Sequence, residues 1–80
     1  MCLNNVLIIL NKDKLIVSSL YLMKDYRVKL FEISGRTRLI YSYNLTKETY
    51  LYKKLNLDKG KFKVTVSGKN FRAFKTIQIN

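Results

Sequence analysis

Hydrophobic and polar residues alternate along most of this 80-residue chain, and a period of two predicts β-strands. The stretch 26–43 shows the pattern best. In its first half apolar residues alternate with Arg27 and Lys29, and a second alternating run follows a turn at Gly35, where glycine supplies the positive φ of a tight connection. The alternation changes parity at 30–31, which a β-bulge or a strand end passing beneath a loop would produce. We therefore predict a hairpin at the centre of an all-β domain.

The rest of the chain repeats this organisation, with polar turn residues about every 8–12 residues. Lys24-Asp25 and Gly60 mark two of the turns, and the alternating run 61–67 is a further clear strand. The pattern predicts about seven short antiparallel strands in a single domain over residues 1–80, packed as a β-sandwich or a barrel.

The first 23 residues form the ambiguous part of the pattern. Val6–Leu10 is apolar without alternation, which is typical of a strand buried on both faces or of a strand that docks onto another chain. The buried strand is the commoner case in proteins. A broken helix over 1–23 is the alternative, because leucine is frequent there, but Asn4-Asn5 and the polar interruption 11–14 favour strands.

Four stretches carry a family resemblance. Residues 28–36, VKLFEISGR, resemble a hairpin of the C-terminal sorting domains of type IX secretion, in which a hydrophobic strand leads to an aromatic residue, an acid and a small-Gly-basic turn. Residues 55–64, LNLDKGKFKV, are similar to that family's Leu-x-Leu-x-x-Gly-x-Tyr-x-Val stretch, and 67–69 and 75–79 resemble its last hairpin. The resemblance covers about two thirds of the chain and implies a small immunoglobulin-like β-sandwich. The resemblance implies a fold, and a fold alone does not imply secretion.

Charge is the strongest signal in the composition. The chain has 16 Lys and Arg against 5 Asp and Glu, a net charge of +11, which favours polyanions or acidic protein surfaces as partners. The apolar run Val6–Leu10 is too short for a membrane span or a signal peptide. We therefore expect an intracellular product, or one assembled into a particle such as a virion inside a cell.

Residues that could perform catalysis are missing or scattered. The chain has no histidine, Cys2 is its single cysteine, and the five acids form no obvious pair. One cysteine cannot form an intrachain disulfide, and neither a zinc site nor a phosphate-binding glycine loop is expected. We predict a non-enzymatic protein with no cofactor and no metal.

The candidate binding residues are basic side chains of the alternating strands and the segments beside them. Alternation places Arg27 with Lys29, and Lys61 with Lys63, on one face of their respective strands. If the two strands lie in one sheet, these side chains form a flat basic patch. Solvent-facing lysines that merely protect sheet edges are the alternative. The complete set is Arg27, Lys29, Arg36, Arg38, Lys53, Lys54, Lys61 and Lys63.

Three functional hypotheses follow. The first is a structural interaction module that docks onto an acidic protein surface in a large assembly, as a virion auxiliary or capsid-decoration protein or a component of another particle, through a basic face and strand edges. The second is a β-domain, such as a ribosome-associated one, that binds RNA or DNA phosphates without sequence specificity. Tyr50, Tyr52 and Phe71 are its candidate base-stacking residues, although core packing is the commoner role. The third, a secretion-type sorting domain, rests on the resemblance alone.

Overall fold

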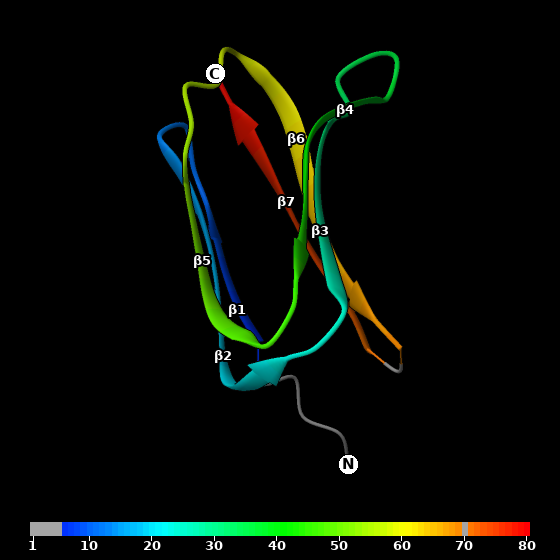
Figure 1. Ribbon diagram of the computed structural model, residues 1–80. Coiled ribbons are helices and arrows are strands. Elements are labelled where there is room, and N and C mark those ends of the chain that lie inside the picture. The colour runs from blue at the N-terminus through cyan, green and yellow to red at the C-terminus, as the bar shows by residue number, and fades with distance from the viewer. Residues whose placement is uncertain (1–5, 70) are drawn as a thin grey trace.

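The computed structural model describes residues 6–69 and 71–80, and within them the chain folds into two antiparallel sheets packed face to face (Figure 1). The strands are β1 Val6–Leu10, β2 Lys14–Met23, β3 Tyr26–Glu32, β4 Arg38–Leu45, β5 Glu48–Lys54, β6 Gly60–Gly68 and β7 Phe71–Ile79. One sheet has the order β1-β2-β5 and the other β4-β3-β6-β7. Cys2, Asn4-Asn5 and Asn70 lie outside the described residues.

This architecture confirms the predicted all-β sandwich, and within the described residues it has seven antiparallel strands. The strand order resembles that of the constant-type immunoglobulin sandwich, with one difference. There the fourth strand belongs to the same sheet as the fifth, whereas here β4 pairs with β3. The sheet that contains β3 and β6 is therefore four strands wide.

Alternation places the apolar side chains of each strand on one face of its sheet. In the sandwich these faces turn toward each other and form the core. In β3, Val28 and Leu30 are fully buried while Arg27 is exposed, and in β6 Val64 and Val66 are fully buried. No buried side chain among the described residues is polar or charged. The core consists of Ile8, Leu10, Leu15, Val17, Val28, Leu30, Leu45, Leu51, Leu57, Phe62, Val64 and Val66.

The predicted irregularity at 30–31 is confirmed, and the extra residue belongs to β4. Leu30 pairs with Tyr41 but Phe31 pairs with Leu39, which leaves Ile40 unmatched. On its other side β3 pairs with β6 without any shift. Phe31 therefore stays on the outward face that it shares with the basic residues of β3. The two predicted turn glycines also have positive φ, 113° at Gly35 and 142° at Gly60.

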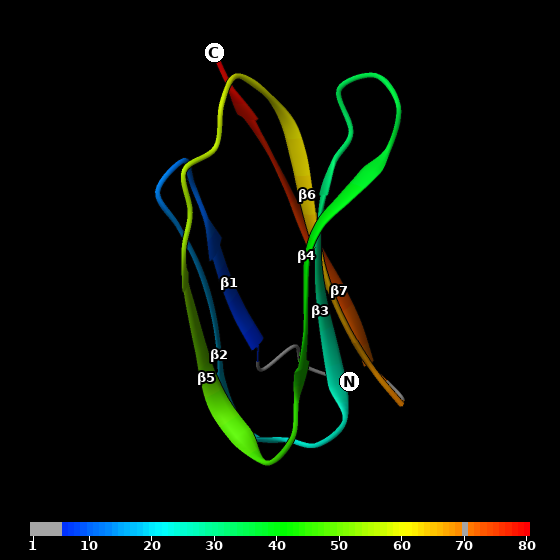
Figure 2. The ribbon, with the colours of Figure 1, turned by 45° about the horizontal axis from the view of Figure 1, so that its top comes forward.

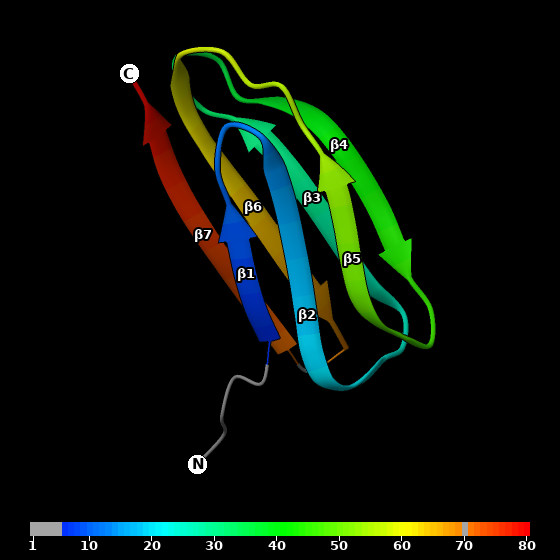
Figure 3. The same cartoon turned by 90° about the vertical axis from the view of Figure 1, so that its left-hand side faces the viewer.

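The first two strands decide between the alternatives for the N-terminal part of the chain. Residues 6–10 and 14–23 are strands, so the broken-helix alternative is wrong for the described part of 1–23. Ile8 and Leu10 are buried, but the Leu7 side chain between them is 58% exposed, so the strand is not buried on both faces. The reason is that β1 lies in the three-stranded sheet, whose outer face no other strand of the described residues covers (Figure 3).

Two lysines bridge the open sides of the sandwich, where the edges of the two sheets approach each other. On one side Lys75 of β7 donates a hydrogen bond from Nζ to the Ile8 carbonyl oxygen of β1, at 3.3 Å. On the other side the Nζ of Lys53 in β5 lies 5.0 Å from the ring centroid of Tyr41 in β4. Lysine at a sheet edge also opposes pairing with a further strand.

Candidate functional site

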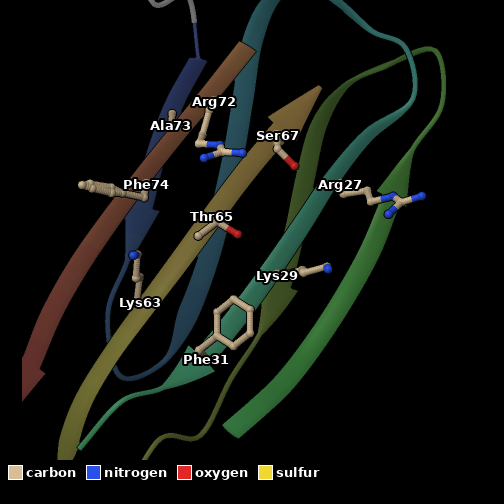
Figure 4. A pocket seen from close by; sticks show the side chains of 9 residues that line it. All are labelled: Arg27, Lys29, Phe31, Lys63, Thr65, Ser67, Arg72, Ala73 and Phe74. Carbon is tan, nitrogen blue, oxygen red and sulfur yellow. The ribbon is translucent and has the colours of Figure 1, made fainter. Parts of the chain in front are cut away.

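The outward face of the four-stranded sheet gathers positive charge. A depression of about 750 Å³ lies on it, with side chains from β3, β6 and β7 (Figure 4). The residues that line it are Arg27, Lys29, Phe31, Lys63, Thr65, Ser67, Arg72, Ala73 and Phe74. We call the four cations Arg27, Lys29, Lys63 and Arg72, together with Phe31 and Phe74, the basic face.

Strand register determines how these side chains are arranged. Directly opposed residues of neighbouring antiparallel strands point to the same face, so the face consists of rows that run across β3, β6 and β7. Each row combines one or two cations with hydroxyl or aromatic side chains. The rows are Arg27–Ser67–Arg72, Lys29–Thr65–Phe74 and Phe31–Lys63–Thr76.

Two aromatic rings lie among the cations. The Phe74 side chain is 59% exposed, and the Nζ of Lys63 lies 4.8 Å from its ring centroid. Phe31 is half-buried in the neighbouring row. A phenyl ring exposed in water costs free energy, which a flat ligand stacked on it would offset. The face therefore offers both positive charge and ring surfaces.

The positive charge of the basic face is not neutralised within the described chain. The outward positions of β3, β6 and β7 carry no Asp or Glu, and none of the four cations forms an ion pair there. The nearest acid along β3, Glu32, alternates away from this face and pairs instead with Arg38. The potential of four cations is therefore available to an anionic ligand.

The structure brings together half of the basic residues singled out from the sequence. Arg27, Lys29 and Lys63 line the depression, and Lys61 lies two residues before Lys63 on the same strand face. Pairing of β3 with β6, on which the flat patch depended, is present. Arg36 lies in the connection between β3 and β4, which projects from one end of the sandwich (Figure 2).

The remaining three predicted residues lie elsewhere and have other contacts. Arg38 donates a hydrogen bond from Nη2 to Glu32 Oε1, and this bond is the main cause that lowers the pKa of the Glu32 carboxyl. Lys53 is engaged with the Tyr41 ring. Lys54 belongs to the three-stranded sheet, where it lies directly opposite Lys14 of β2. Burial raises the pKa of the Tyr41 phenol, and the neighbouring Tyr43 adds to the rise.

Sequence reasoning missed Arg72, Phe74 and Phe31 as members of the face. The signal for the first two is the alternation of β7, which places 72, 74 and 76 on the side opposite Ile77 and Ile79. Of the three aromatic residues expected to stack on bases, none lies on this face. Two of them belong to the other sheet, and Phe71 is stacked on Tyr26 with 5.5 Å between ring centroids.

Residues 6–69 and 71–80 contain no group of three or more His, Cys, Asp or Glu side chains that could hold a metal ion. They also contain no helix with the length and apolar character needed to cross a membrane. No family model, curated protein or solved structure matches the chain. The resemblance to sorting domains therefore stays a prediction.

Proposed function

We propose that the protein is a non-enzymatic binding module whose basic face binds single-stranded nucleic acid. The observation that carries this proposal is the interleaving of four unneutralised cations with Phe31 and the exposed Phe74 on one sheet face. Cations bind the phosphates of a nucleic acid, and exposed aromatic rings stack on its bases. Bases are accessible for stacking in a single strand, whereas in a duplex they are stacked on each other.

The composition of the face argues against sequence specificity. Lys29, Lys63, Arg27 and Arg72 contact phosphates irrespective of the base, and a phenyl ring stacks on every base. If all four cations contact phosphates, the logarithm of the affinity falls with the logarithm of the salt concentration with a slope of about −3. This slope follows from about −0.7 for each phosphate contact of a single strand.

The test is fluorescence anisotropy with a labelled single-stranded oligonucleotide at several salt concentrations. Arg27→Glu combined with Lys63→Glu reverses the charge of two lining residues and should abolish binding at moderate salt. The matched control, Lys12→Glu combined with Lys54→Glu, changes the net charge equally at exposed positions away from the face. Equal losses in both double variants would mean that net charge alone drives binding, and no binding by the wild type would refute the proposal.

A second variant tests the role of the rings. Phe74→Ala removes a stacking surface without any change of charge, and we expect a loss of about 1–3 kcal/mol of binding free energy for the oligonucleotide. Binding of heparin, a polyanion without bases, should not change. If the oligonucleotide binds the variant as tightly as the wild type, the rings do not stack on bases.

Docking of the same face onto an acidic protein surface of a larger particle remains the alternative. The unneutralised cations support it equally, but an acidic protein offers no bases to the exposed Phe74 ring. If Phe74→Ala binds the oligonucleotide as tightly as the wild type does, and also binds heparin as tightly as the wild type does, this alternative is favoured. The virion, localisation and sorting-domain hypotheses stay predictions.

A further inference from the structure

The outer face of the three-stranded sheet differs in character from the basic face. The residue pairs across β1, β2 and β5 place Leu7, Ile9, Ile16, Tyr50 and Tyr52 on this outward side, with Ser18 between Leu7 and Tyr50. We call these five apolar and aromatic residues the apolar face. Leu7, Tyr50 and Tyr52 are 58%, 54% and 52% exposed. Among the described residues no other strand covers this side of the sandwich (Figure 3). Contiguous exposed apolar surface on a soluble domain marks an interaction site.

We propose that the apolar face is the contact surface of a dimer with a second copy of this chain. This inference is independent of what the basic face binds. The five positions carry no charge, in a chain of net charge +11. An acidic partner would be drawn to the basic face instead, whereas an uncharged, sheet-flat surface is complementary to itself.

Charge determines which orientation of the two copies is favourable. Lys14 and Lys54 pair with each other at one end of the apolar face, next to the row that contains Ile16 and Tyr52. A two-fold axis in the plane of the interface and perpendicular to the strands makes the strands of the two copies run in opposite directions. The lysine pair of one copy then lies beyond the Leu7 end of the other, so the two pairs do not meet.

The positive charge of the two copies does not prevent this contact, because the basic faces end up on opposite outer surfaces. Four stacked sheets have three gaps of about 10 Å, so the basic faces lie about 30 Å apart. The Debye length at physiological ionic strength is about 8 Å, and repulsion over nearly four such lengths is largely screened. Such a dimer presents two basic faces, which would strengthen binding to a long polyanion through multivalency.

The area of the apolar face sets the expected strength of the dimer. Two half-exposed tyrosines, one exposed leucine and two partly exposed isoleucines offer on the order of 400–500 Å² per chain, given about 150–250 Å² for a whole aromatic side chain. Two copies would bury about 800–1,000 Å², slightly less than a standard stable interface. We therefore expect a dissociation constant between about 10 μM and 1 mM.

The experiment is sedimentation velocity of the full chain over protein concentrations from about 10 μM to 1 mM, which spans the expected dissociation constant. The wild type should pass from monomer to dimer, and added salt should leave the dimer intact. In Leu7→Lys each copy places one lysine in the interface, and association should weaken about tenfold or more. Leu39→Lys is the matched control, because Leu39 is 50% exposed in β4 of the other sheet.

Each result decides the question. Dimerisation that Leu7→Lys removes and Leu39→Lys leaves unchanged supports the proposal, provided that circular dichroism gives both variants the wild-type β spectrum. Tyr52→Lys is a second variant in case Leu7→Lys does not fold, and it should act in the same way. A wild type that stays monomeric over the whole range overturns the proposal, whatever other protein binds this face. Equal weakening by Leu7→Lys and Leu39→Lys also overturns it, because net charge would then be the cause.

Discussion

Gly68 is the position at which we expect the smallest substitution to have a large effect on stability. A Cβ atom added there would lie 2.4 Å from Cε1 and 2.5 Å from Cδ1 of the Tyr26 ring. That ring is itself held by Phe71, with an angle of 8° between the stacked planes. The φ of Gly68 lies outside the left-handed region, so backbone strain is not the reason for a glycine here. The reason is the close approach of the ring.

Gly68→Ala must displace the Tyr26 ring by about 1 Å to reach ordinary contact, and overpacking of this kind costs about 1–3 kcal/mol of the free energy of unfolding. In a domain of this size 1 kcal/mol lowers Tm by about 4–8 °C, so we expect a decrease of about 5–20 °C. Thermal and urea unfolding followed by circular dichroism measure both quantities.

A double-mutant cycle isolates the steric contact. In a Tyr26→Ala background the added methyl group has room, and Gly68→Ala should then be neutral or should stabilise by up to about 1 kcal/mol, because alanine restricts the unfolded chain more than glycine does. The same loss of stability in both backgrounds would show that the Tyr26 ring is not the cause, and the reasoning would be refuted.

Three further predictions concern the core, a turn and an ion pair. Leu30→Ala should lower the free energy of unfolding by about 2–5 kcal/mol in urea titrations, because Leu30 is fully buried and the cavity cannot collapse completely; a loss below 1 kcal/mol would contradict this packing. Lys47 has a φ of 60°, so Lys47→Gly should stabilise the chain by about 1 kcal/mol in the same assay; a loss would contradict it. The lowered pKa of Glu32 means that its ionised form stabilises the fold above the unfolded pKa, and that this contribution is lost as pH falls through the folded pKa. In Arg38→Ala a carboxyl NMR titration should give a higher pKa for Glu32, and an unchanged pKa would refute the role of Arg38.

The pattern of apolar and polar residues in the sequence was sufficient to predict about seven antiparallel strands, including the strand Val6–Leu10 and the run 61–67 within β6. It also predicted the turn conformation of Gly35 and Gly60 and the irregularity at 30–31. These features are local, since alternation, turn glycines and a change of parity are each recorded within a few residues of sequence. Alternation therefore separates the two faces of a strand before the fold is known.

The sequence could not show which face of a strand the opposing sheet covers. Leu7 and Ile8 are neighbours of similar apolarity, but Leu7 is 58% exposed and Ile8 only 8%. The difference arises because the opposing sheet packs on one side of β1 alone. In the same way, Arg72 joins Arg27 on the basic face only through the residue pairs on both sides of β6. Together these pairs bring Arg27 and Arg72 onto one face although 45 positions separate them (72 − 27), which is beyond the reach of a local pattern.

The segregation of charge is the property that connects the two proposals. A net charge of +11 distributed evenly over so small a chain would attract a polyanion to every surface and would oppose contact with a second copy. Instead, the four cations of the basic face project from one sheet. The five uncharged residues of the apolar face project from the other, where Lys14 and Lys54 lie at one end of them. Antiparallel sheets packed as two layers permit this division, because each sheet has one face free for an independent role. Substitutions on one face should therefore leave binding at the other nearly unchanged, apart from the gain that two linked basic faces provide.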